Sequence, residues 1–325
     1  MNKSLRICTV GGGSGMPIVN KALVKAGFTN ISSIVTTFDS GGDSGRMRTD
    51  ERGNLLAFSD YWRALMSLWE DGEQKKNWEE MLRFRDGRGR NFGNTFFRFM
   101  SEKSGSLLEV DTLFSSLVGA KLCGEVVPVS VEPAELCFRT ESGKEYRGEH
   151  RLDELRMSLD KVSKIWLEPE VKASDQAILD LLEAEVVIVC PGSMYGSVLT
   201  NFLAKGMVQA YNKSKAKKIL MTNIMTTANE NDGFCQNDYV KLFSNFLKKE
   251  SPFSLVLMPD LSKLEKKDLE ESFLNYKMEH SKMIEFCSES VVETVLEDMV
   301  VVEKRNKTLR HDVAKMAKVF SKMLR

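Results

Sequence analysis

The sequence is poor in histidine, in long apolar runs and in any excess of charge of one sign. Only three histidines occur among 325 residues, and their wide separation argues against a histidine-rich metal centre. No apolar run approaches the roughly 18 residues of a membrane-spanning helix. Basic and acidic residues are balanced at 46 each, so no net basic field attracts nucleic acid or an anionic membrane. We therefore expect neither a nucleic-acid partner nor a membrane span.

The six cysteines form no metal-binding or disulfide pattern. They are scattered without C-x-x-C spacing, and Cys8 and Cys190 each stand in an apolar run. This placement favours buried free thiols. The residues before Leu5 lead directly into an apolar run and lack the features of a secretory signal. Together these features predict a reducing, cytoplasmic setting.

Short apolar runs that end in turn residues predict the strands of a parallel sheet. They lie at 5–10, 31–38, 184–190 and 218–223. A helix is predicted at 17–26, between the first two strands, so the chain opens with a right-handed βαβ unit. Further expected elements are helices at 54–73, 78–83, 93–103, 172–183, 197–213 and 242–250, a strand at 253–258, and a C-terminal amphipathic helix.

Two segments differ from this pattern. The region of about 50–118 is predicted to be helical, with its many aromatic side chains packed in the core rather than forming a base-stacking surface. The stretch 126–147 alternates apolar and polar residues around the turn Glu141–Gly143, which predicts an antiparallel excursion of about 121–170 at one edge of the sheet. Because no Pro- or Ser-rich linker interrupts the chain, we expect residues 1–325 to form one α/β domain with a mostly parallel, doubly wound sheet.

A glycine cluster joins the first predicted strand to the first predicted helix. Its residues are Gly11, Gly12, Gly13, Ser14 and Gly15. Backbone N–H groups and the positive end of a helix form an anion site in this context. The cluster lacks the Gly-Lys-Ser/Thr of a Walker A loop, and Met16 replaces the third glycine of the dinucleotide fingerprint. The pattern favours phosphate or nucleotide binding over NAD, and a tight turn without a ligand remains the alternative.

A second cluster of glycine, serine and charged residues follows the second predicted strand. Asp39 and Asp43 are candidates for catalysis as a general base or for binding a divalent cation such as Mg²⁺. Their neighbours could close on a ligand and neutralise its phosphate: Ser40, Gly41, Gly42, Ser44 and Arg46. A polar loop without a ligand is the structural alternative.

Polar residues also follow the third and fourth predicted strands. Gly192, Ser193 and Tyr195 come after one strand, and Asn223 and Thr226 come after the next. No G-x-S-x-G motif is present, so a nucleophile elbow is not supported, and Ser193 alone is typical of a helix N-cap. Because parallel strands end at one edge of a sheet, all four loops together predict a ligand cleft along that edge.

With these loops, the chain resembles the CofD-like family, and within it the bacterial gluconeogenesis-factor (YvcK-type) branch. The matching motifs run in order through most of the chain: GGGSG at 11–15, DSGGDSGRMR at 39–48, RNFGNT at 90–95 with Asn94, PGSMYGSVLTNFL at 191–203, NIMTTANENDG at 223–233 and RHDV at 310–313 with Arg310. This resemblance implies a Rossmann-like, three-layer α/β/α fold.

The resemblance also implies two functions. One branch contains 2-phospho-L-lactate transferases, which move a phospholactyl group from a nucleotide-diphosphate donor to a deazaflavin alcohol with a divalent metal. The other branch resembles UDP-sugar-binding regulators that support carbon metabolism, cell shape and wall synthesis. This sequence departs from the family motifs at several positions. Asp39-Ser40 stands where the family has paired aspartates, and Asp43 stands where it has a serine. The family segment GDIRN is matched at 50–54 with a different spacing of Arg and Asn, and Arg90 or Asn91 stands where the family has a histidine.

The expected function is therefore binding of a UDP-sugar or another nucleotide diphosphate, with the glycines around the diphosphate and Arg310 near the sugar or uracil end. A metal-dependent phosphotransferase is the second expectation, with Asp39 and Asp43 around Mg²⁺. An NAD-dependent oxidoreductase is the third. Folds of this kind often pair, which leaves a homodimer open.

Overall fold

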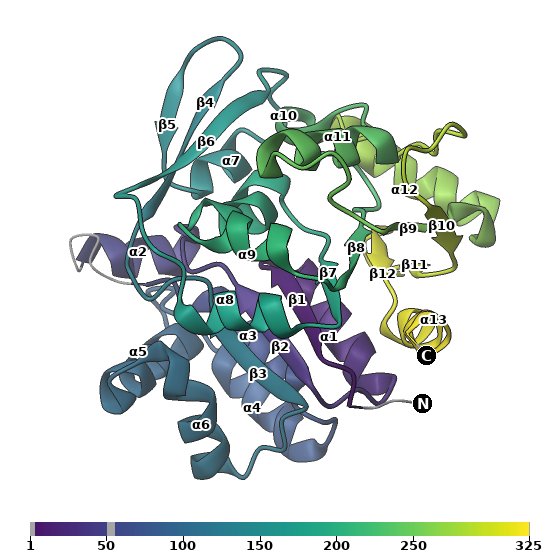
Figure 1. Cartoon of the computed structure of the whole chain (residues 1–325). Coiled ribbons are helices and arrows are strands. Elements are labelled where there is room, and N and C mark those ends of the chain that lie inside the picture. The colour runs from purple at the N-terminus through teal and green to yellow at the C-terminus, as the bar shows by residue number, and fades with distance from the viewer. Residues whose placement is uncertain (1–3, 51–55, 325) are drawn as a thin grey trace.

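The computed structural model describes residues 4–50 and 56–324. Its centre is a seven-stranded sheet with the order β10-β9-β8-β7-β1-β2-β3, in which each strand pairs in parallel with its neighbours (Figure 1). These strands are β1 (Ile7–Gly11), β2 (Ile31–Val35), β3 (Gly124–Pro128), β7 (Val186–Val189), β8 (Lys217–Met221), β9 (Leu255–Pro259) and β10 (Thr294–Glu297).

The sheet reverses its direction of growth between β1 and β7. Ile7 of β1 lies opposite Ile31 of β2 on one side and Val186 of β7 on the other. Strands β2 and β3 add outward from β1, whereas β8, β9 and β10 add outward from β7. This is the order of a doubly wound nucleotide-binding sheet, and the reversal is its topological switch point. The predicted doubly wound, mostly parallel sheet is confirmed.

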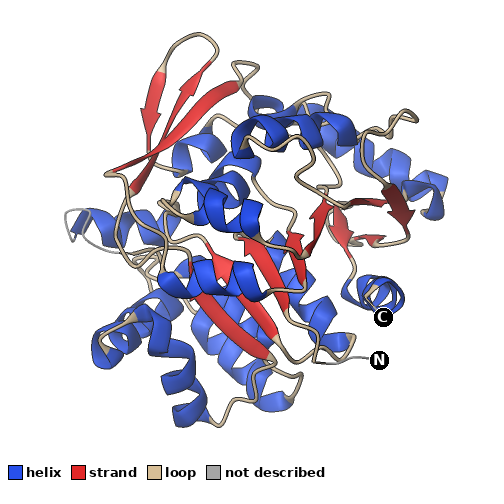
Figure 2. Cartoon of the chain, viewed as in Figure 1, coloured by secondary structure: helices blue, strands red, loops and turns tan. Residues whose placement is uncertain are grey.

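Helices cover both faces of the sheet (Figure 2). One face carries α8 (Asp175–Glu183), α9 (Met207–Lys213) and α11 (Gln236–Leu247), and the other carries α1 (Gly15–Lys25), α3 (Ser59–Leu68) and α13 (Val313–Met323). Successive β1 residues point to opposite faces, so that Ile7 packs in one core cluster and Cys8 in the other. The result is the expected three-layer arrangement, with the C-terminal helix where the sequence predicted it.

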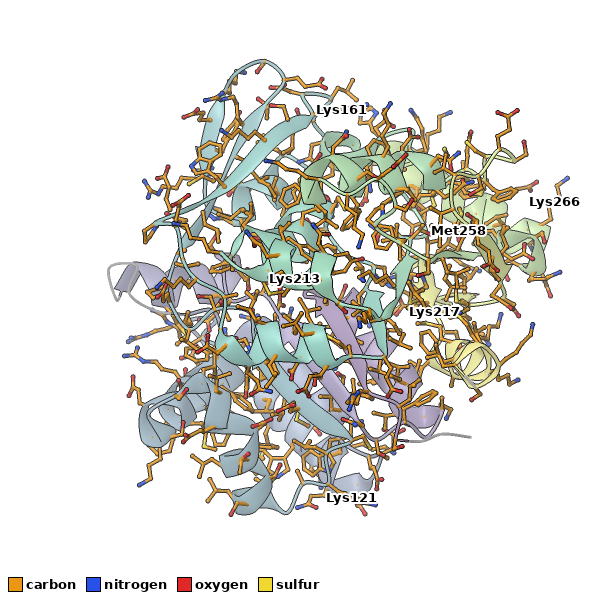
Figure 3. All side chains as sticks on the ribbon, in the orientation of Figure 1. Lys121, Lys161, Lys213, Lys217, Met258 and Lys266 are labelled. Carbon is orange, nitrogen blue, oxygen red and sulfur yellow. The ribbon has the colours of Figure 1, made fainter. Side chains whose placement is uncertain are left out.

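The core and the surface divide as the polarity of the side chains requires. Met258 of β9 is buried, whereas Lys213 and Lys266 lie at the surface (Figure 3). All six cysteines are free, and Cys8 and Cys190 are buried as predicted. Within the described ranges, no helix has the length and apolar character needed to cross a membrane.

The helical region contributes its own aromatic core. It comprises α3, α4 (Glu73–Arg83), α5 (Phe92–Ser104), the short helix η1 (Leu107–Glu109) and α6 (Val110–Val118). The rings of Phe97 and Phe114 are fully buried with centroids 5.5 Å apart, and Trp69 packs edge-on against Phe114. The prediction that aromatic residues of this region build a core is confirmed for these residues.

The predicted excursion differs in one respect. Gly124–Pro128 forms β3, a parallel edge strand of the central sheet, because Val126 and Val127 are buried in different core clusters on its two faces. The antiparallel part is a separate sheet of β4 (Glu135–Thr140), β5 (Glu145–Arg147) and β6 (Val162–Glu168). Its β4–β5 turn is at 141–143, as predicted, with Gly143 at φ +86°.

The predicted helix at 197–213 is wrong as a single element. The chain forms a π-helical turn η2 (Met194–Val198), a 3-10 segment η3 (Leu199–Leu203) and then α9. The Asn201 side chain donates to the carbonyl oxygens of Ser197 at 2.8 Å and Gly11 at 3.1 Å. Gly206, at φ +107°, then separates η3 from α9. A side chain that bonds the backbone in this way competes with a regular helix.

Other elements were missed or shortened by the sequence prediction. Of the helix expected at 54–73, the structure forms α3, and part of the predicted start lies outside the described residues. The helix at 266–278 was missed because its sequence is charged and only weakly periodic. The remaining elements are α2 (Gly42–Asp50), α7 (His150–Glu154), α10 (Ala228–Asn231), η4 (Leu261–Lys263), α12 (Lys266–Met278), β11 (Val300–Val302) and β12 (Leu309–His311).

Two phenylalanines of α5 test the aromatic core. Phe97→Ala removes a fully buried ring, and we expect it to lower the free energy of unfolding by about 3–5 kcal/mol. Phe99→Ala, on the same helix but 58% exposed, is expected to change it by about 0.5 kcal/mol or less. Urea unfolding followed by far-UV circular dichroism measures both. Equal losses for the two variants would contradict this assignment of the core.

Candidate functional site

Three strand-end loops meet at the switch point of the sheet. A Cβ placed on Gly15, the first residue of α1, would lie 2.0 Å from the carbonyl oxygen of Pro191 in the loop after β7. The Gly192 N–H donates to Asn223 Oδ1 at 2.8 Å, and Asn223 Nδ2 donates to the Gly192 carbonyl at 2.9 Å. The loops after β1, β7 and β8 are therefore locked together by close packing and a reciprocal pair of hydrogen bonds.

These loops form one wall of a cleft of about 390 Å³. The cleft brings together the following residues that the sequence singled out: Ser14, Gly15, Gly192, Ser193, Asn223, Thr226 and Arg310. The last of these comes from β12, close to the C-terminal end of the chain. Segments more than 290 positions apart in the sequence thus face the same cavity.

The other residues of the first glycine cluster lie behind this wall. Gly11 ends β1, and a Cβ on Gly12 would lie 2.7 Å from both Asp60 Oδ2 and the Thr36 side chain. Gly13 has φ +61° and donates its N–H to Asp60 Oδ2 at 2.9 Å. These glycines allow the backbone to pass close to β2 and α3. They shape the loop, while Ser14 and Gly15 face the cleft.

Tyr195 and Thr226 are buried beside the cleft. The Tyr195 hydroxyl donates to the Val162 carbonyl at 3.4 Å, and burial raises the pKa of this phenol to about 12, so it stays neutral. Thr226 lines the cleft, and its Oγ1 accepts the Lys282 N–H at 2.9 Å. The structure therefore places Tyr195 against β6 and Thr226 against the segment that follows α12.

The second cluster, residues 39–46, contacts two separate parts of the structure. Asp39 Oδ1 accepts the Gly41 N–H at 2.7 Å and Oδ2 accepts the Ser59 hydroxyl at 2.5 Å. The buried Ser40 Oγ lies 3.0 Å from His150 Nδ1 on α7. This half of the cluster therefore contacts α3 and α7.

Its other half contacts α5 and the loop before it. Asp43 is buried in the first turn of α2, and its Oδ2 accepts the Asn91 N–H at 3.1 Å and Asn94 Nδ2 at 3.0 Å. Arg90 Nη1 is 3.6 Å from Asp43 Oδ1. Arg46 Nη1 donates to the carbonyl oxygen of Arg88 at 2.8 Å. Asp43 thereby joins α2 to α5, and Arg46 joins α2 to the loop before α5. Of the remaining predicted residues, Ser44 is buried and Gly42 has φ +49°.

Asp39 and Asp43 are the two side chains that the sequence predicts around Mg²⁺. Asp39 and Asp43 are engaged by different groups, one by α3 and its own loop and the other by α5 and Arg90. Within residues 4–50 and 56–324, no three His, Cys, Asp or Glu side chains are grouped so that they could hold a metal ion. The two aspartates are thus held by different partners, and a cation shared between them stays a prediction.

Buried carboxyl groups that sequence reasoning missed lie beneath the first and second loops. Burial, and then the charge of Asp39, raise the pKa of Asp60 from 3.8 to about 6. The same two causes raise the pKa values of Glu149 and Asp153. Asp153 also lines the cleft. These three groups hold protons more tightly than free carboxyls do.

Two further cleft residues position polar atoms. Glu230 of α10 accepts the Ser193 hydroxyl and the Met194 N–H, each at 2.6 Å, and burial raises its pKa. His311 has a pKa lowered to about 4 by burial, so its imidazole is neutral near pH 7. Among the described residues, nothing hydrogen-bonds its buried Nε2. Both residues stand in motifs that the sequence singled out, His311 in RHDV at 310–313 and Glu230 in NIMTTANENDG at 223–233, but neither was named as a site residue.

Gly15 offers a direct test of the close approach between the loops. Gly15→Ala would place a methyl group against the Pro191 carbonyl, so we expect a loss of stability of about 1–3 kcal/mol. Gly87→Ala is the control because its Cβ would meet open space. Thermal unfolding of both variants measures the difference. A Gly15→Ala variant as stable as Gly87→Ala would show that the loops do not pack as described.

Asp60 predicts a pH dependence of stability. Since its folded-state pKa is raised, the folded protein binds the proton more tightly than the unfolded chain, and stability falls as pH rises through about 4 to 6. The shift corresponds to about 3 kcal/mol. Asp60→Asn should flatten this fall in urea unfolding measured between about pH 4 and pH 7.

The control for this experiment is Asp160→Asn. Hydrogen bonds from Ser142 lower the pKa of Asp160, so its contribution is lost as pH falls, which is the opposite sign. An unchanged pH profile for Asp60→Asn, or the same change in both variants, would contradict the assignment of a raised pKa to Asp60.

Comparison with known proteins shows to which family the chain is related. The family model described as "2-phospho-L-lactate transferase CofD" matches residues 7–317. A Thermotoga maritima protein named "Putative gluconeogenesis factor" is 30% identical over 339 aligned residues, covering 99% of this chain and 100% of the relative. The "Gluconeogenesis factor" of Listeria monocytogenes is 28% identical over 250 residues, covering 75% of this chain and 74% of the relative.

A solved structure has the same fold. A Bacillus halodurans protein of the UPF0052 family superposes with a TM-score of 0.84 at 23% sequence identity, covering 97% of this chain and 99% of the other. Since the family model spans nearly all the described chain and the Thermotoga relative aligns over its full length, this protein belongs to the CofD family, together with the gluconeogenesis factors that it resembles.

Proposed function

We propose that this protein binds a UDP-sugar or a related nucleoside diphosphate in the cleft at the switch point, as a gluconeogenesis-factor-type regulator of carbon metabolism, cell shape or wall synthesis. The observation that carries the proposal is the convergence of the loops after β1, β7 and β8 with Arg310 on one cavity. Doubly wound sheets bind nucleotides at this position. The names of the relatives support the metabolic part.

The start of α1 suits a diphosphate. Ser14 is the exposed N-cap residue, its hydroxyl caps no N–H of the described helix, and the first turn contains no acidic residue. The N-terminal N–H groups of a helix attract anions. Arg310 is exposed at the cleft and can pair with a phosphate. The diphosphate is therefore assigned to the Ser14–Gly15 wall, with Arg310 opposite.

The neutral end of the ligand is assigned to the remaining polar wall. His311 lines this wall, and burial lowers its pKa to about 4, so the imidazole is neutral near pH 7. A cleft of about 390 Å³ falls within the usual range of roughly 300–1,000 Å³ for small-molecule sites. A UDP-sugar offers both a diphosphate and several hydroxyl groups.

Carboxylates in the same cleft oppose an anionic ligand, and their environment limits this effect. Glu279 pairs with Arg156 at 2.9 Å. Burial raises the pKa values of Asp153 and Glu230. Since protonation removes negative charge, the raised pKa values favour the state of these two carboxyls that opposes an anion least.

A metal-dependent phosphotransferase is the second candidate. It draws support from the transferase name of the family model and from the carboxylates of Asp39 and Asp153 near the cleft. The divergent positions of Asp39 and Asp43 make binding without chemistry the better-supported function. An NAD-dependent oxidoreductase is the weakest candidate, because Met16 replaces the third fingerprint glycine.

Calorimetric titration of the whole chain distinguishes these candidates. The ligands are UDP-N-acetylglucosamine, GDP and NAD, each with and without Mg²⁺. We expect UDP-sugar binding that does not require Mg²⁺, and Arg310→Gln should weaken it roughly tenfold through loss of a charged hydrogen bond. Arg305→Gln, an exposed arginine in the segment between β11 and β12, is the matched control.

The alternatives have separate outcomes. GDP binding that requires Mg²⁺ would favour the phosphotransferase, and tight binding of NAD alone would contradict both leading candidates. If Arg305→Gln weakened UDP-sugar binding as much as Arg310→Gln, the ligand would respond to general surface charge, and the assignment to the cleft would be wrong.

A further inference from the structure

We propose a second ligand site, for a small phosphomonoester, on the opposite flank of the first glycine loop. A cavity of about 400 Å³ lies there between α1, α3, α4 and the loop before α5. Its basic lining residues are Lys21, Arg63, Arg83 and Arg85. This second site does not depend on the proposed nucleotide site, because none of these four basic side chains lines the switch-point cleft.

The charge of this cavity is unbalanced. Glu79 is its acidic lining residue, and it is shared: Lys21 Nζ lies 2.9 Å from it, whereas Arg83 Nη2 approaches only to 4.0 Å. Arg63 lies 3.6 Å from Asp60 Oδ1 beneath the cavity. Two carboxylates thus face four cations, and the remaining positive charge attracts an anion.

The arginines are held in place and remain accessible. Arg85 Nη1 donates to the Gly89 carbonyl at 3.0 Å. In the same loop, Asp86 Oδ1 accepts the N–H groups of Arg88 at 2.9 Å and Arg90 at 2.8 Å. Arg83, in contrast, is 67% exposed, and its guanidinium lies 4.0 Å from Glu79 Oε2. A fixed loop that follows the exposed guanidinium of Arg83 can accept a ligand without large rearrangement.

The lining also defines the class of ligand. Guanidinium groups match the oxygen atoms of a phosphate in a bidentate fashion, and several of them favour a dianion. Ile18, Trp62 and Met66 supply an apolar wall for a carbon skeleton. The ligand is therefore a phosphate ester of a small metabolite. Inorganic phosphate, which shares the charged group, is the simplest probe.

The two cavities are separated by a single wall. Ser14 and Ile18 contribute to the linings of both. Arg63 contacts Asp60 Oδ1, while Asp60 Oδ2 accepts the Gly13 N–H. A phosphomonoester in the basic cavity would therefore lie across α1 from a nucleotide in the cleft, with both ligands bound at the same time.

Calorimetry on the full chain at constant ionic strength tests this site. The probes are inorganic phosphate and glycerol 3-phosphate, with glycerol as the uncharged control. Arg83→Gln should weaken binding of both phosphates roughly tenfold, and Arg83→Glu should abolish it. Arg88→Gln and Arg88→Glu are matched controls, since Arg88 is exposed in the same loop but does not line the cavity. They should change affinity by less than about twofold.

The outcomes separate this site from the nucleotide cleft. Equal losses at Arg83 and Arg88 would show diffuse attraction and overturn the proposal, as would unchanged phosphate binding in folded Arg83→Glu, checked by circular dichroism. Phosphate binding that depends on Arg310 and is displaced by UDP-N-acetylglucosamine would assign the phosphate to the cleft and also overturn it. Phosphate binding that depends on Arg83, in a protein that binds no UDP-sugar, would support this site while contradicting the proposed nucleotide function.

Discussion

The close approach of Gly15 to Pro191 is the contact on which the site depends. At this position the chain leaves β1 and enters α1 with no room for a Cβ atom. The contact holds the loop after β1 against the loop after β7, and Asn223 then fixes the loop after β8 to the same point. Asn201 adds a hydrogen bond from the irregular turn back to Gly11. A cleft at the switch point follows from these contacts and the parallel order of the strands.

Beneath the glycine loop, a buried polar network orients α1. Asn20 accepts the Thr9 hydroxyl at 2.9 Å and donates to Ser33 Oγ at 2.8 Å and Ser67 Oγ at 3.1 Å. These residues belong to α1, β1, β2 and α3, so a single amide joins both strands to both helices. A buried network with satisfied partners specifies one arrangement more strongly than apolar contacts do. It sets the angle at which α1 presents its N-terminus to the cleft.

Much of this could be predicted from local sequence, because strands and glycine turns are encoded by short patterns. The runs predicted at 5–10 and 31–38 each precede a polar loop, and the parallel order brings such strand ends to one edge. The burial of both faces of β3 could not be predicted from the alternation of apolar and polar residues alone. Glu230 was missed because its role depends on tertiary burial beside Ser193. The sequence suggested Asp43 as a ligand of a metal ion, whereas in the structure its Oδ2 accepts hydrogen bonds from Asn91 and Asn94.

Asp60 connects these features in one side chain. One of its oxygen atoms accepts the N–H of Gly13, and the other faces Arg63 in the basic cavity. Burial, and then the charge of Asp39, raise the pKa of this carboxyl, whereas the charge of Arg63 lowers it. A phosphate bound beside Arg63 would offset the charge of that guanidinium and favour the protonated carboxyl. Occupancy of the basic cavity would thereby change the charge of the group that holds the glycine loop, which provides a physical link between the two cavities.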